Sequence, residues 1–125
     1  MKERTDSLRE MVEAVRDFHR QHGFEVGSEN IQTMHYRMNL LMEELGEICQ
    51  ALTKGKGKDQ IAEEHADLFI LLLGNCLTMN IDLIEEFWKK MAQIAERKAR
   101  QVGNCRRVSD WGNSEREEED ANSCS

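Results

Sequence analysis

The chain has 125 residues, of which 17 are Lys or Arg and 24 are Asp or Glu, so its formal net charge is −7. This length suits one domain with a hydrophobic core of its own. The acidic balance argues against binding to a nucleic-acid polymer or to an anionic membrane surface, since both require a basic face. The absence of proline favours helices joined by glycine-based turns.

No segment has the pattern of a targeting signal or a membrane span. The charged N-terminus lacks the apolar stretch of a signal peptide. The most apolar run, residues 66–79, has 14 residues, and a membrane span needs about 20. We therefore expect a cytoplasmic protein whose four cysteines, none in a CxxC pair, remain reduced thiols. They are Cys49, Cys76, Cys105 and Cys124.

Apolar side chains recur at helical spacing through most of the chain. The first two predicted helices cover residues 7–22 and residues 28–54. Gly23 follows the first helix as a stop signal, and Ser28 is the candidate N-cap of the second. The GKGK sequence at 55–58 then breaks the pattern.

The next two predicted helices begin near Asp59 and at Asp82. The helix from Asp59 to about Asn80 is apolar on nearly every side, so we expect it to be the central, most buried helix. The apolar pattern of the helix that begins at Asp82 ends by residues 102–103. Four helices with short connections predict an all-α antiparallel bundle.

The sequence changes character near residue 104. We expect one helical domain over residues 1–103 and a polar, acidic tail over residues 104–125. The last 13 residues have five acids, one base and almost nothing apolar, so the tail is expected to be disordered.

Two pairs of carboxylates are unusual because of their surroundings. A step of about 100° per residue places Glu44 and Glu47 on one stripe with Leu40 and Ala51, away from the main apolar face. Carboxylates bracketed by apolar residues on a second stripe point toward protein rather than toward water. Glu64 and Asp67 share a face of the predicted central helix. A buried aspartate must be paired, protonated or bound to a metal.

Basic partners are scarce near these carboxylates. Arg37 and Lys54 lie near the ends of their helix, and the predicted central helix has no base after Lys58. Four oxygen-donor groups on two facing helices favour a hard divalent cation, Mg²⁺ or Mn²⁺. The alternative from spacing alone is that Glu44 and Glu47 form a solvated edge. In that alternative Asp67 pairs with one of three bases: Lys89, Lys90 or Arg97.

Other metal centres fit the sequence poorly. A di-iron bundle requires Glu-x-x-His motifs, and no histidine here has Glu three residues before it. No Cys/His set has the spacing of zinc ligands. The motifs of serine hydrolases, P-loop proteins and dinucleotide-binding proteins are also absent.

The pattern Glu43-Glu44-x-x-Glu47, followed after 16 residues by Glu64-x-x-Asp67, resembles the MazG family. These proteins are all-α nucleoside triphosphate pyrophosphohydrolases related to the dimeric dUTPases. Three segments carry the resemblance over about residues 28–100: LLMEELGEICQAL, IAEEHADLFILLLGNCLTMNIDL and FWKKMAQIAERK.

The resemblance implies a MazG-like bundle that forms a homodimer or a homotetramer. It implies that Mg²⁺ is held by the four residues Glu44, Glu47, Glu64 and Asp67. Cleavage between the α- and β-phosphates would release a nucleoside monophosphate and pyrophosphate. Glu43 is a further candidate catalytic residue whose role stays open.

The resemblance also implies phosphate contacts by Lys90 and Arg97 and a substrate contact by Asn75. The family's asparagine lies about one residue away from the position of Asn75, and another of its asparagines is replaced here by Ile94. These differences affect recognition of the base or sugar rather than the metal motif.

The sequence is therefore compatible with three functions. The main hypothesis is a house-cleaning (d)NTP pyrophosphohydrolase. The second is a related enzyme for another pyrophosphate, such as phosphoribosyl-ATP. The third is a non-catalytic helical interaction module.

Overall fold

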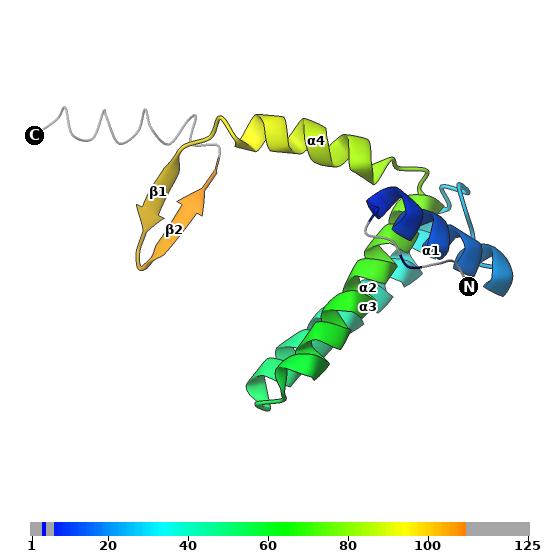
Figure 1. Ribbon diagram of the computed structural model, residues 1–125, viewed down its shortest axis with the longest axis horizontal. Helices are drawn as coiled ribbons and strands as arrows, with labels where there is room; N and C mark the ends of the chain where they lie inside the picture. The colour runs from blue at the N-terminus through cyan, green and yellow to red at the C-terminus, as the bar shows by residue number, and fades with distance from the viewer. Residues whose placement is uncertain (1–3, 5–6, 110–125) are drawn as a thin grey trace, which may run out of the picture. The chain divides into compact units, whose positions relative to one another are not determined.

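The computed structural model describes residue 4 and residues 7–109, and these residues are mostly helical (Figure 1). They form two compact units, which divide after Ile84. The elements in chain order are α1 (Leu8–His22), α2 (Ile31–Thr53), α3 (Lys58–Thr78), α4 (Leu83–Ile94), β1 (Ala99–Val102) and β2 (Cys105–Val108). The predicted all-α class with four helices is confirmed.

The first unit contains a long helical hairpin and a shorter helix. α2 and α3 lie side by side, and α1 packs against α3 near the C-terminal end of α3 (Figure 1). The buried apolar cluster joins Val15 of α1 to Leu73 and Leu77 of α3. Gly23 ends α1 in the left-handed conformation, with φ of 73°, as the stop signal predicted.

The loop before α2 is tied to the end of α3. The backbone N–H of Gly27 donates to the carbonyl of Leu77 at 2.8 Å, and that of Glu29 donates to Thr78 at 3.0 Å. The N-cap of α2 is Asn30 rather than the predicted Ser28. The Asn30 side chain accepts hydrogen bonds from the backbone N–H groups of Gln32 and Thr33. This removes two of the unpaired donors at the helix start.

α3 has more buried residues than any other described helix, as expected of the most buried helix. Its buried residues lie near the C-terminal end, from Leu73 to Thr78. Upstream, Phe69, Ile70 and Leu72 are 41%, 46% and 40% exposed. In this unit α3 packs against α1 and α2, and these two helices do not surround it.

A polar cluster lies where the three helices of this unit meet. The Nε of Arg37 donates to the Oδ1 of Asn75 at 2.7 Å, and both side chains are buried. Beside them, His19 is 2% exposed, and its Nδ1 lies 3.0 Å from the carbonyl oxygen of Glu25. Gly74 leaves space on α3 for both Arg37 and His19. These contacts fix the packing of α1 on the α2–α3 hairpin.

The second unit differs from the helix predicted to extend to residues 102–103. α4 ends at Ile94, and β1 and β2 pair as an antiparallel hairpin that turns at Gly103. β-Branched residues near the ends of the strands and a glycine with φ of 57° favour this hairpin over a longer helix. The predicted tail boundary therefore falls inside a hairpin. The division into a domain and a tail otherwise remains a prediction, and residues 110–125 lie outside the described part.

Other sequence predictions concern the cysteines and the membrane. The three described cysteines, Cys49, Cys76 and Cys105, are free thiols, and Cys124 lies outside the described residues. No described helix is by itself long and apolar enough to cross a membrane; only α3 and α4 taken together reach that length and composition.

Candidate metal and nucleotide site

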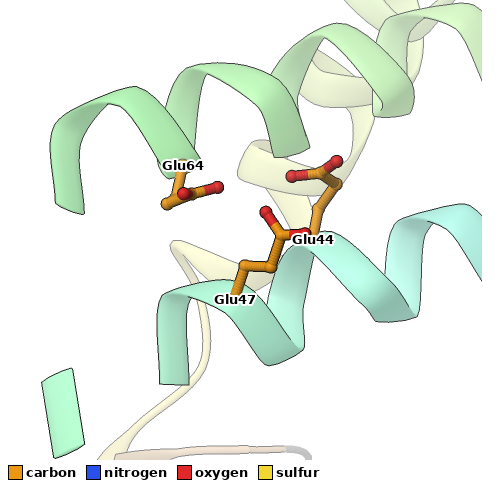
Figure 2. Close-up of side chains that lie close together, drawn as sticks. All are labelled: Glu44, Glu47 and Glu64. Carbon is orange, nitrogen blue, oxygen red and sulfur yellow. The ribbon is translucent and has the colours of Figure 1, made fainter. Parts of the chain in front are cut away.

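Three of the predicted metal ligands meet between α2 and α3. Glu44 and Glu47 lie one helical turn apart on α2, and Glu64 faces them from α3 (Figure 2). One carboxylate oxygen from each of the three residues can be chosen so that all three lie within 4.8 Å of one another. The periodicity of two antiparallel helices therefore produces the predicted cluster.

Two oxygens of this cluster are buried without a partner. They are the Oε2 atoms of Glu44 and Glu64, and neither accepts a hydrogen bond from the described residues. Both residues are half-buried, whereas Glu47 is exposed. A buried carboxylate oxygen without a donor is costly, so this arrangement favours a proton or a cation between the groups.

Mutual repulsion and burial raise the pKa of two of the carboxyl groups. For Glu44, burial raises the pKa most, followed by the charges of Glu47, Asp67 and Glu43. For Glu64, the carboxyl group of Glu47 within hydrogen-bonding reach raises the pKa most, followed by burial and the nearby charges. The protonation of one of these carboxyl groups therefore affects the pKa of the others.

Basic side chains near this site do not neutralise its carboxylates. None of the residues that shift the pKa of Glu44 or Glu64 is basic. No described ion pair involves the cluster, and Lys89, one of the alternative partners, binds Glu86 at 3.4 Å. The donors are carboxylate oxygens throughout, which is the ligand chemistry of Mg²⁺ and Mn²⁺. The residues therefore fit a hard divalent cation.

Asp67 connects the cluster to a cavity. This aspartate is exposed, and its charge acts on both Glu44 and Glu64. With Glu44 it lines an open cavity of about 320 Å³, whose other walls are Leu40, Ile70 and Leu71. The cavity combines two carboxylates with an apolar wall of a size that suits a small organic group.

The remaining predicted site residues lie elsewhere. Glu43 is exposed on α2, and its charge contributes to the raised pKa of Glu44. Asn75 is 5% exposed and bonded to Arg37, so it contributes to helix packing in the single chain. Lys90 is exposed on α4, and Arg97 is half-buried beyond that helix. These two residues belong to the second unit and remain predicted phosphate contacts.

Two features of the site region were not predicted. The first is that Ile70 lines the cavity; its position next to Leu71 on α3 was the available signal. The buried position of Arg37 was also missed, because its partner Asn75 is 38 residues away in sequence.

The four acidic residues lie on α2 and α3, the two helices on which the resemblance to the MazG family places them. A family model described as phosphoribosyl-ATP pyrophosphohydrolase matches residues 15–94. The chain belongs to this phosphoribosyl-ATP pyrophosphohydrolase family. The match confirms the resemblance at the level of the superfamily that this family shares with MazG, and it is not specific to MazG. No protein of curated function matches the chain.

Proposed function

We propose that the protein is a Mg²⁺-dependent nucleoside triphosphate pyrophosphohydrolase that converts a (d)NTP to the (d)NMP and pyrophosphate. The observation that supports this proposal most strongly is the pair of buried, unpartnered oxygens of Glu44 and Glu64 beside Glu47. The family supplies the reaction class, cleavage of a pyrophosphate bond. Removal of non-standard nucleotides from the nucleotide pool in the cytoplasm is the corresponding biological role.

The four acidic residues have a common task in this proposal. Glu44, Glu47, Glu64 and Asp67 hold Mg²⁺, with Mn²⁺ as a substitute. When bound by these residues, the cation would supply charge neutralisation for the triphosphate and a Lewis acid for the attacking water. The carboxylates orient the cation and keep the phosphate end of the substrate beside the cavity. Glu43, which is exposed one position before Glu44, is the candidate general base.

The cavity next to the cluster is the proposed site of the nucleoside. Leu40, Ile70 and Leu71 provide an apolar wall for a base or a sugar, while Asp67 and Glu44, which also line the cavity, would hold the cation that binds the phosphates. We assign phosphate contacts to Lys90 and Arg97. We assign Asn75 an indirect role: it accepts a hydrogen bond from Arg37 and so stabilises the packing of α2 on α3 beside the substrate.

A homodimer or homotetramer is part of the proposal. α2 and α3 expose large apolar side chains that a single chain leaves in contact with water. Met38 and Met42 of α2 are 45% and 61% exposed, and Phe69 of α3 is 41% exposed. Burying such side chains against another copy would be favourable by about 25 cal/mol for each Å² removed from water.

Phosphoribosyl-ATP is the second candidate substrate. The description of the matching family names this substrate. The same carboxylates would hold the cation in either case, because both substrates contain a triphosphate and are cleaved at the same bond. The apolar cavity does not distinguish between the two.

A competition assay tests the proposal. The purified protein is incubated with each common NTP and dNTP and with phosphoribosyl-ATP, with Mg²⁺ or with EDTA, and the products are separated by anion exchange. Mg²⁺-dependent formation of monophosphate and pyrophosphate from a (d)NTP supports the main proposal. Turnover of phosphoribosyl-ATP alone replaces it with the second candidate.

Two variants link the activity to the site. Asp67→Asn removes a predicted metal ligand, whereas Glu63→Gln changes an exposed neighbouring acid outside the cluster. Loss of turnover only in Asp67→Asn supports the site. Diphosphate and phosphate as products contradict the proposed cleavage position. Absence of turnover with every substrate favours the non-catalytic interaction module.

A further inference from the structure

Arg37 is a buried cation without an anionic partner among the described residues. It is 7% exposed, and its Nε donates to the Oδ1 of Asn75, which is a neutral amide. No described residue accepts a hydrogen bond from either of its Nη groups. Burial lowers the pKa of Arg37, yet an arginine stays protonated in proteins. Because a buried charge is costly unless it is paired, the remaining N–H donors favour an acceptor that a ligand supplies.

The guanidinium of Arg37 lies about one helical turn from the walls of the cavity beside the carboxylate cluster. Arg37 comes three residues before Leu40, the cavity wall on α2, and Gly74 comes three residues after Leu71, a cavity wall on α3. Residues three apart share a helix face. A Cβ at Gly74 would overlap the Nη2 of Arg37, so this nitrogen lies over that turn of α3. The spacing therefore places the Nη groups beyond the end of the cavity that is farther from Glu44.

The side chain next to the guanidinium carries no negative charge. The Nδ1 of His19 lies 3.0 Å from the carbonyl oxygen of Glu25, and since a carbonyl only accepts, Nδ1 carries the proton. Burial is the main cause that lowers the pKa of His19, and the charge of Arg37 lowers it further. His19 is therefore neutral. Position 74 has no side chain, which allows the guanidinium to lie against α3.

The carboxylates, the cavity and Arg37 follow one another along α2 and α3. Glu44 and Arg37 are seven residues apart on one face of α2, which corresponds to about 10 Å along the helix axis. Leu40 lies between them, and Ile70 and Leu71 are the apolar walls that α3 contributes to the same cavity. In a nucleotide, the α-phosphate and the far edge of a purine base are separated by a similar distance. A nucleotide whose phosphates lie at the carboxylates therefore brings the edge of its base to the guanidinium.

We propose that Arg37 recognises the base of the substrate and selects a 6-oxopurine, guanine or hypoxanthine. Its Nη groups donate to O6 and N7, two acceptors that lie side by side on such a base. Adenine presents an N–H donor in place of O6, so the arginine discriminates against it. Asn75 is a positioning residue, because its amide oxygen holds the Nε of Arg37. This inference rests on the proposed function, since it takes the phosphates of the substrate to lie at the carboxylate cluster.

A series of nucleotide analogues tests the selection on the native chain. The α,β-methylene analogues of GTP, ITP and ATP resist cleavage at the proposed bond, and calorimetry with Mg²⁺ measures their binding. We expect the GTP and ITP analogues to bind alike. The ATP analogue should bind at least about tenfold more weakly, which corresponds to about 1.4 kcal/mol. The 7-deaza form of the GTP analogue lacks the N7 acceptor and should bind about fivefold more weakly than its parent.

A charge-conserving variant links the selection to Arg37. Arg37→Lys keeps the positive charge and removes the planar fork of donors. It should bind the GTP analogue about tenfold more weakly than the native chain does and bind the ATP analogue about equally. Arg16→Lys is the matched control, because Arg16 is an arginine of α1 that pairs with Glu13. This control should keep the native preference. Circular dichroism verifies the fold of both variants, and the analogue series needs neither of them.

The outcomes separate this inference from the proposed function. Equal binding of the GTP and ATP analogues by the native chain overturns the inference and leaves the proposed function in place. A preference that persists in Arg37→Lys also overturns it, because another residue then selects the base. Binding of phosphoribosyl-ATP without binding of the GTP analogue overturns the choice of base. If the native chain binds none of the nucleotides, the proposed function fails, and the inference fails with it.

Discussion

Gly74 of α3 lies against the side chains of His19 from α1 and Arg37 from α2, and replacing it with Ala tests that packing. A Cβ at position 74 would lie 2.7 Å from the Nε2 of His19 and would also overlap the Nη2 of Arg37. Neither neighbour can move freely. His19 is 2% exposed and lies 3.0 Å from the Glu25 carbonyl, while Arg37 donates to Asn75 at 2.7 Å.

The magnitude follows from three contributions. Overpacking a core position costs about 1–3 kcal/mol. Displacing Arg37 weakens a hydrogen bond from a charged group, worth about 1.5–3 kcal/mol. Alanine offsets about 1 kcal/mol because it favours the helix over glycine. We therefore expect Gly74→Ala to lower the free energy of unfolding by about 3 kcal/mol. In a domain of this size the melting temperature should fall by about 15 °C.

Gly46→Ala is the matched control. Gly46 also lies inside a helix, but nothing lies within 4 Å of an added Cβ. This variant should therefore gain about 1 kcal/mol from helix propensity alone. Urea and thermal unfolding of both variants, followed by circular dichroism, measure the difference. If Gly74→Ala proves as stable as Gly46→Ala, the close approach of the three helices is refuted.

Three further predictions concern charged and polar groups. In metal-free protein, the raised pKa values of Glu44 and Glu64 mean that the native state holds protons more tightly than the unfolded state. Stability should therefore fall as pH rises from the ordinary carboxyl value of 4.5 to the raised pKa. Glu64→Gln should weaken this fall in urea titrations with EDTA; an unchanged slope would contradict the repulsion. The pKa of His19 is lowered, chiefly by burial, so stability should be complete above pH 6.5 and decline as pH falls below it. His19→Asn should flatten that decline in the same titrations, and a persistent slope would exclude His19 as its source. Asn75→Ala should cost about 1.5–3 kcal/mol by leaving Arg37 without its acceptor. A double-mutant cycle with Arg37→Met should show strong coupling, and additive effects would contradict the contact.

Local sequence patterns predicted the helices and the proximity of three of the carboxylates well. The periodicity of α2 and α3 is strong, and a short glycine-containing loop joins them, so the positions of Glu44, Glu47 and Glu64 followed from the helical repeat. Asp67 lies beside the cluster because it follows Glu64 by three residues, about one helical turn, on α3.

Features that depend on distant residues were not predictable in the same way. The contact between Arg37 and Asn75 joins residues far apart in sequence, and nothing in either local pattern indicates it. The apolar sequence of α3 predicted the most buried helix, but it did not predict that Phe69 and Leu72 are exposed, because hydrophobicity does not show whether the cover comes from the same chain. The strands after α4 were missed because residues 99–102 continue a helix-compatible composition, and only pairing with β2 makes them a strand.

The most direct test of the central claim is the binding of Mn²⁺ to the carboxylate cluster, followed by the electron paramagnetic resonance signal of free Mn²⁺. The native protein should remove Mn²⁺ from solution, and Glu44→Gln and Glu64→Gln should each weaken this binding at least about tenfold, which corresponds to about 1.4 kcal/mol. Glu63→Gln should bind as the native protein does, since Glu63 lies outside the cluster. If the native protein leaves the free Mn²⁺ signal unchanged, or if Glu44→Gln and Glu64→Gln bind as tightly as the native chain, the cluster is not a metal site.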